Sequence, residues 1–103
     1  MVNIGKMLKQ AKQMQAQMGR LQEELAALEK SCSVGGGVVE VTARGDQTLV
    51  RIAIKPEACD PEDVEALEDM ILTAVNGALH EVKRAAEERM SRITGGLGMP
   101  GLM

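Results

Sequence analysis

A small β-sheet is predicted for residues 35–55, which read GGGVVEVTARGDQTLVRIAIK. Apolar side chains recur there with the two-residue period of strands that have one buried face. They are Val39, Val41 and Ala43 in one strand and Val50, Ile52 and Ile54 in the next. The polar segment 44–47 between them predicts a turn in which Gly45 supplies a positive φ. We expect a hairpin, widened to three antiparallel strands by residues 31–34 before the glycine turn 35–37.

A long amphipathic helix is predicted before the sheet, from an N-cap at Asn3 to about Leu28. Its apolar residues are spaced alternately three and four apart, as in a coiled-coil seam. The seam consists of Ile4, Met7, Ala11, Met14, Met18, Leu21, Leu25 and Leu28. Such a helix spans roughly 37 Å, too long for a compact chain of this size. We therefore expect its Met-rich half to project as an arm, with Gly19 a point of close approach, and residues 21–28 to pack into the protomer and dimer core.

A second long helix is predicted after Pro56 ends the last strand. The segment 60–63 suggests its start, with Asp60 as N-cap and Pro61 in the first turn. The helix is expected to reach about Ile93. Its buried stripe is predicted to be Val64, Leu67, Ile71, Val75, Ala78, Val82 and Ala85, with Arg89 continuing the stripe beyond the core. The fold class is α+β in the order α-β-β-β-α, a single domain of residues 1–93 followed by a flexible Gly-rich tail, 94–103.

The composition predicts a marginally stable core. The 103 residues include eight Met and no Phe, Tyr or Trp, so oligomerisation would help stability. No segment resembles a signal peptide or a membrane span, which predicts a cytoplasmic protein without a membrane partner. Cys32 and Cys59 stand far apart in a chain with one His, so no metal or other cofactor is expected. We interpret both as small apolar side chains, and a disulfide between them stays open.

Charge is distributed unevenly along the chain, although the net charge is −3. Residues 1–22 carry four positive charges and no negative one, whereas residues 57–69 carry seven acidic residues and no Lys or Arg. The four cations lie away from the apolar seam and are Lys6, Lys9, Lys12 and Arg20. A solvated helix surface commonly mixes signs to gain ion pairs. On the residues alone, this face is equally compatible with polyanion binding and with plain solvation.

A second basic set on the later helix is interleaved with acidic residues, which favours pairing within the helix. The set consists of Lys83, Arg84, Arg89 and Arg92, among Glu81, Glu87 and Glu88. Without aromatic side chains to stack on bases, any nucleic acid bound would be duplex DNA, held mainly at phosphates. No pair of nucleophile and base and no convincing carboxylate dyad is evident. We therefore predict no enzymatic activity and no small-molecule substrate.

Several segments, each weak alone, occur in an order that is specific when taken together. They are Gly5-Lys6-Met7-Leu8-Lys9-Gln10-Ala11, the glycine turn with Val38-Val39-Glu40-Val41-Thr42, Asp60-Pro61-Glu62-Asp63, Leu67-Glu68-Asp69-Met70-Ile71, Ala74-Val75-Asn76 and Thr94-Gly95-Gly96-Leu97-Gly98. In these segments the chain resembles the YbaB/EbfC family of bacterial nucleoid-associated proteins. The resemblance implies a tweezers-like homodimer whose helical arms grip DNA, with a role in nucleoid organisation and gene regulation.

By position, the resemblance assigns DNA binding to the basic residues of the first helix, with those of the second helix as second choices. The chain departs from the family pattern at Gly77, where an acidic or polar helix former is expected, and at Cys59, where Leu is usual. Gly77 is expected to loosen the second helix.

Two function hypotheses of different classes follow. The first is a homodimeric nucleoid-associated protein that binds duplex DNA through phosphate contacts. The second is a scaffold module in which the Met-rich seam binds another protein and the lysines are merely solvated. For the homodimer, the predicted interface consists of Met14, Met18, Leu21, Leu25 and Leu28.

Overall fold

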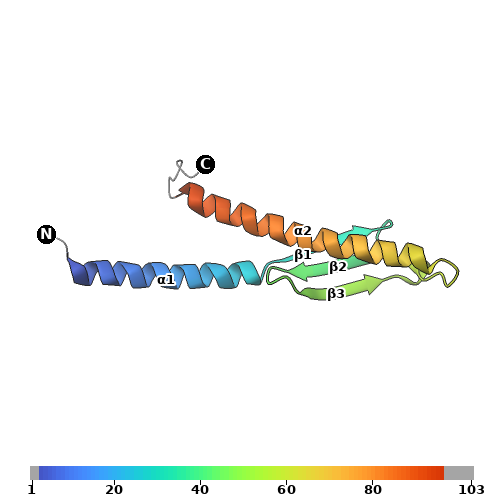
Figure 1. Cartoon of the computed structure of the whole chain (residues 1–103), viewed down its shortest axis with the longest axis horizontal. Helices are drawn as coiled ribbons and strands as arrows, with labels where there is room; N and C mark the ends of the chain where they lie inside the picture. Colours follow the sequence, from blue (N-terminus) through green and yellow to red (C-terminus); the bar gives the residue numbers. More distant parts are fainter. Residues whose placement is uncertain (1–2, 97–103) are drawn as a thin grey trace.

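The computed structural model describes residues 3–96, the last three by their backbone only. The elements are α1 (Ile4–Ala26), β1 (Glu29–Val34), β2 (Val39–Arg44), β3 (Leu49–Ile54), the 3-10 turn η1 (Pro56–Ala58) and α2 (Val64–Gly96). This confirms the predicted α-β-β-β-α order. In Figure 1, α2 lies along the sheet, whereas α1 continues past the end of the sheet. The radius of gyration is therefore 20.5 Å, against about 13 Å for a compact chain of this length.

The sheet is antiparallel in the order β1-β2-β3. Val41 of β2 lies between Cys32 of β1 and Ile52 of β3, and Val39 lies between Val34 and Ile54. Since directly opposed side chains point to the same face, these two rows share one face of the sheet. The helix α2 packs on this face over β1 and β2 and leaves β3 largely uncovered.

The core between α2 and the sheet is built from small side chains. Its members are Val39, Val41, Ala43, Ala58, Ala74, Ala78 and Val82. Around it, Leu67, Ile71 and Val75 are partly buried, which confirms most of the predicted stripe of α2. The prediction that Val64 is buried was wrong, because Val64 is 53% exposed. It is the first residue of α2, and α2 begins beyond the ends of the strands (Figure 1). Among the residues whose burial is described, no buried side chain is larger than valine. One protomer therefore has little apolar burial to stabilise it.

The first helix begins and ends close to the predicted residues. The side chain of Asn3 accepts a hydrogen bond from the backbone N–H of Lys6 at 3.1 Å, which confirms the predicted N-cap. The helix ends at Ala26, two residues before Leu28. The Leu28 carbonyl instead accepts a hydrogen bond from the N–H of Gly45 at 2.8 Å, so the chain is already joined to the β2–β3 turn there.

The second helix begins and ends later than predicted. The side chain of Asp60 caps a turn instead of the helix, accepting from the N–H of Glu62 at 2.9 Å. Asp63 takes the helix-capping role through the N–H of Ala66, at 3.3 Å. At the other end α2 continues through Gly96, three residues beyond the predicted end at Ile93. The segment 94–96 is therefore helical, and residues 97–103 of the predicted tail lie outside the described residues.

Three glycines predicted to matter behave differently from one another. The positive φ of the β2–β3 turn belongs to Gln47, at 69°, and not to Gly45. Gly45 is required for space, because a Cβ there would collide with the backbone carbonyl of Leu25. A Cβ on Gly77 would lie 2.5 Å from the Sγ atom of Cys32, so this glycine lets α2 approach β1 closely instead of loosening the helix. Gly19 has nothing within 4 Å of its Cβ position, so the close approach predicted there is absent from the described chain.

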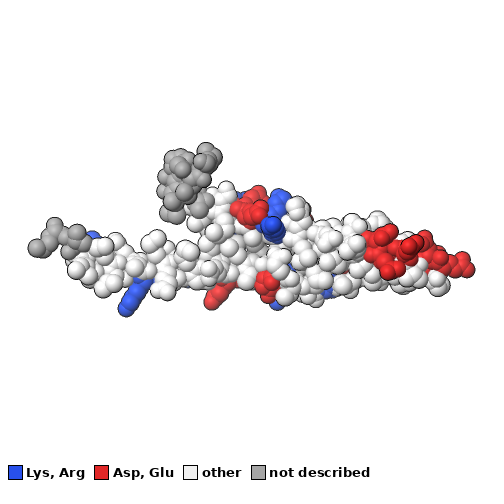
Figure 2. Space-filling model, viewed as in Figure 1, with Lys and Arg blue, Asp and Glu red and all other residues white. Residues whose placement is uncertain are grey.

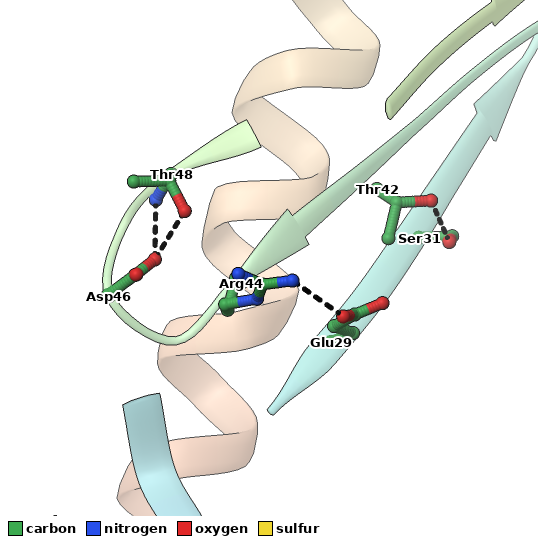
Figure 3. A network of polar contacts seen from close by, with 6 residues as sticks. All are labelled: Glu29, Ser31, Thr42, Arg44, Asp46 and Thr48. Atoms are coloured by element: carbon green, nitrogen blue, oxygen red, sulfur yellow. Dashed lines mark hydrogen bonds and ion pairs between the residues drawn. The ribbon is translucent and has the colours of Figure 1, made fainter. Parts of the chain in front are cut away.

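The sheet face opposite α2 is polar. Cross-strand pairs link β1 to β2: the hydroxyls of Ser31 and Thr42 lie 2.7 Å apart, and Arg44 donates to Glu29 at 3.2 Å (Figure 3). In the adjoining turn, Asp46 accepts from the N–H and the hydroxyl of Thr48. These hydrogen bonds lower the pKa of the Asp46 carboxyl. The alternation of polar and apolar residues thus places this face in solvent and the other against α2.

Candidate nucleic-acid interface

The N-terminal part of α1 forms an exposed projection, which we call the arm (residues 4–20). No residue of α1 is buried. Along the arm the apolar seam is open to solvent, with Met14 64% and Met18 54% exposed. Residues Leu21, Leu25 and Leu28 are half-buried where α1 meets the sheet. The predicted exposed arm is therefore confirmed. Leu21, Leu25 and Leu28 are not among the described residues that pack against the core, so their packing into a dimer core stays a prediction.

The four cations of α1 lie on the solvated surface of this helix. Every one of them is exposed, and none has a carboxylate within salt-bridge distance in the described part of the chain. The first turn of α1 contains no acidic residue. Within residues 3–96, the charges of Lys6, Lys9, Lys12 and Arg20 are therefore left to be screened by solvent ions.

Two of the basic residues of α2, unlike those of α1, form ion pairs within the described chain. Arg84 makes ion pairs with Glu81 at 3.0 Å and with Glu88 at 3.6 Å, and Arg92 lies 4.0 Å from Glu88. The hydrogen bond from Arg84 lowers the pKa of Glu81, and the same contact raises the pKa of Arg84. The predicted pairing within the helix is confirmed for these two arginines. Lys83 and Arg89 have no carboxylate at such a distance among residues 3–96.

The molecule is electrically polarised along its long axis. The arm and the C-terminal half of α2 both extend from one end of the sheet (Figure 1). Figure 2 shows acidic side chains gathered at the opposite end, over the start of α2. All seven acidic residues of the segment 57–69 are exposed. A polyanion would consequently be attracted to the arm and repelled from the other end.

A cleft of about 170 Å³ opens where the arm joins the sheet and α2 leaves it. Its lining is Leu28, Lys30, Ala85, Glu88, Arg89 and Arg92. Lys30 was not predicted as a site residue from the sequence. Strand alternation was the available clue, because Lys30 is two residues from Cys32 and so lies on the α2 side of β1.

Other kinds of site find little support in the structure. Within residues 3–96, no three His, Cys, Asp or Glu side chains are grouped so that they could hold a metal ion. Cys32 and Cys59 are both free thiols, and His80 is exposed. Neither described helix combines the length and apolarity of a membrane span.

Comparison with known proteins identifies the family of the chain. The family model described as the YbaB/EbfC DNA-binding family matches residues 1–97. The chain belongs to this family. It is 54% identical to a protein named nucleoid-associated protein from Moorella thermoacetica, over 98% of this chain and 97% of that one. It is 52% identical to a protein of the same name from Pelotomaculum thermopropionicum, over 97% of this chain and 95% of that one.

The fold itself also occurs in a solved structure. The crystal structure of an uncharacterized protein from Helicobacter pylori matches with a TM-score of 0.67, covering 95% of this chain and 100% of that one at 23% identity. The family is described by DNA binding and not by an enzymatic reaction.

Proposed function

We propose that this protein is a cytoplasmic, nucleoid-associated protein that binds duplex DNA as a homodimer and takes part in nucleoid organisation and gene regulation. The main support for the proposal is the charge of the arm. Its residues Lys6, Lys9 and Lys12 are exposed and have no carboxylate partner among the described residues. Relatives about half identical over nearly the whole chain bear the name nucleoid-associated protein.

Phosphate contacts are the binding mode that these side chains favour. Lysine is a flexible point charge that suits the phosphate backbone and carries no sequence information there. The absence of aromatic residues removes the stacking platform on which single-strand binding depends. The acidic end would be repelled by DNA, so the protein would approach a duplex with the arm and the C-terminal half of α2 foremost.

Three observations support the homodimer. In the described part of one protomer no buried side chain is larger than valine, so an independent protomer would be only marginally stable. The apolar seam of the arm is uncovered, with Met7 55% exposed. Beside α2, the apolar row of β3 is also open, with Ile52 47% and Val50 42% exposed. Contiguous apolar surfaces of this kind commonly mark interfaces.

The same exposed seam favours one alternative, a scaffold protein in which methionines bind a helix of another protein. Met side chains adapt readily to different partners. In that case the lysines of the arm would contribute only solubility. Duplex affinity and its salt dependence distinguish the two functions.

The proposal is tested by measuring duplex DNA affinity across a salt series, with a light-scattering mass on the same sample. We expect a dimer whose log affinity falls with log salt at a slope of about −0.9 for each phosphate neutralised. The triple variant Lys6→Glu, Lys9→Glu, Lys12→Glu should lose binding and keep the dimer mass.

A charge-matched pair of variants controls for net charge. Lys9→Glu with Lys12→Glu removes the same charge as Arg51→Glu with Lys55→Glu, which are exposed residues of the sheet and its end. Only the first pair should weaken binding strongly. Equal effects of the two pairs, or undiminished binding by the triple variant, would contradict the assignment of DNA contacts to the arm.

A further inference from the structure

The cleft at the base of the arm brings together cations from two separate elements. Lys30 is the second residue of β1. Arg89 and Arg92 belong to the part of α2 that extends past the end of the sheet. Leu28 and Ala85 provide the apolar part of the lining. The cations of the arm all lie on one helix, whereas those of the cleft are held by two elements whose separation the packed core determines.

The charge balance of the cleft favours an anionic ligand. Three cations line it and Glu88 is the single acidic residue of its lining. Glu88 is shared between Arg84 and Arg92, at 3.6 and 4.0 Å. Neither Lys30 nor Arg89 has a carboxylate at ion-pair distance in the described chain. Outside the lining, Glu81 is near enough to Lys30 for that charge to contribute, after the hydrogen bond from Arg84, to the lowered pKa of its carboxyl. Among the lining residues themselves, the positive charges outnumber the negative one.

The cleft is also of suitable size for a phosphate group. Its volume of about 170 Å³ is several times the roughly 30 Å³ that a water molecule occupies in the liquid. Arginine presents parallel N–H donors to phosphate oxygens, and a lysine ammonium adds a point charge from another direction. Two arginines and one lysine on different elements can thus surround one phosphodiester.

We propose that this cleft binds a backbone phosphate of duplex DNA, with Lys30 as a DNA-contacting residue and Glu88 as an internal competitor that weakens the contact. The inference rests on the proposed DNA-binding function and adds a defined subsite to it. Cations held by two packed elements fix the position of a phosphate, whereas lysines on a projecting arm attract the duplex with little constraint. The cleft therefore sets the register of the DNA relative to the sheet.

The test measures duplex affinity over a salt series for single variants of the full chain. Lys30→Gln and Arg89→Gln should each weaken binding about fivefold and reduce the magnitude of the salt slope by about 1. The matched controls are Lys55→Gln and Arg51→Gln, which remove the same charge from exposed positions on the sheet and after β3, away from the cleft. They should leave the salt slope unchanged.

Substitution of Glu88 tests the same subsite through an increase in DNA affinity. Glu88→Gln should tighten binding about threefold more than Glu87→Gln, although both remove one negative charge from neighbouring exposed positions of α2. A gain of function of this kind does not arise from misfolding. It would separate local competition in the cleft from the general effect of net charge.

The outcomes separate the subsite from the function on which it rests. If the parent binds duplex DNA with a steep salt dependence but Lys30→Gln matches Lys55→Gln, the subsite is overturned and the proposed function stands. Equal affinities of the two Glu variants would overturn the competitor role of Glu88. If the parent shows no salt-dependent duplex binding, the proposed function fails and the subsite fails with it.

Discussion

The two helices of this protein have similar apolar patterns, but the apolar stripe of α2 is buried and that of α1 is exposed. Both are amphipathic, but α2 places Ala74 and Ala78 fully buried on the sheet, with Gly77 directly over Cys32. The stripe of α1 is made of larger residues, such as Met14 and Met18, and stays exposed. Small side chains allow a helix to approach a strand closely, and the seam of α1 has only one of them, Ala11. A helical period therefore predicts which side is apolar but not what covers it.

The charges of the two helices differ in the same way. On α2, Arg84 and Arg92 are engaged by glutamates of the same helix, so part of their charge is already neutralised. The cations of α1 have no such partners among the described residues. Equal numbers of basic residues thus give a stronger field around α1, which is why the arm, not the longer helix, carries the proposed function.

The largest expected difference between the helices concerns their apolar stripes. Val82→Asp places a charge at a fully buried position of α2 and should cost about 3–5 kcal/mol, a large part of the stability of a small domain. We expect circular dichroism to show an unfolded chain. Met14→Asp on the arm should keep the helical spectrum and change only the light-scattering mass. Unfolding of both variants would show that the fold depends on a covered seam of α1 as much as on the core of α2.

A smaller difference concerns the glycine inside each helix. Gly77→Ala should lower the free energy of unfolding by about 1–2 kcal/mol, because its Cβ meets Cys32 and overpacking outweighs the gain in helix propensity. Gly19→Ala, with open space around it, should raise that free energy by roughly 0.5–1 kcal/mol. Urea denaturation measures both. Adding Cys32→Ala to Gly77→Ala should restore most of the loss, and a failure to do so would argue against this contact.

A further difference concerns single arginines. Arg20→Gln removes an unpaired charge and should weaken duplex binding about fivefold, whereas Arg84→Gln removes a charge already paired twice and should weaken it less than about twofold. Fluorescence anisotropy at one fixed salt concentration compares the two. A greater loss for Arg84→Gln would reverse the ranking of the helices as DNA-binding elements.

The smallest expected effect is a dependence of stability on pH that arises on α2. Because the pKa of Glu81 is lowered in the folded chain by the hydrogen bond from Arg84, this pair stabilises the protein above the ordinary pKa of a glutamate. The contribution disappears as the pH falls through the lowered pKa.

Melting temperatures of the parent and of Glu81→Gln, compared at neutral and acidic pH, measure this contribution. The difference between the two proteins should shrink on acidification. It should be small throughout, because the pair is exposed. Lys9→Gln serves as the control, since Lys9 has no carboxylate partner in the described chain and its effect should not follow this pH range.

The order of elements could be predicted because local patterns decide it. The two-residue period of β2 and the capping chemistry of Asn3 both act within a few residues. The start of α2 could not be placed as well, because Asp60 and Asp63 are both suitable caps and the sequence does not show which one the chain uses for the turn. Gly45 and Gly77 were misjudged for a related reason: what each requires is space beside a residue far away in the sequence.

In the candidate site, too, the residues related by local spacing were predictable and those brought together by packing were not. The cations of the arm were predictable because they lie on one helix, where spacing alone places them on one surface. The cleft was not predictable, since Lys30, Arg89 and Arg92 line one cleft only after β1 and α2 have packed together. The pairing of Arg84 with glutamates at positions three before and four after it was again a local matter and was foreseen.

The sequence by itself determined the helices, the strands, the polarity of charge and the side of each element that is apolar, because these depend on neighbours along the chain. Only the tertiary structure decided that α2 covers β1 and β2 but not β3, that the arm stands free of the sheet, and that three cations converge at its base. Those features depend on close packing between distant segments, where a single Cβ or a half-turn of helix changes which side chains meet.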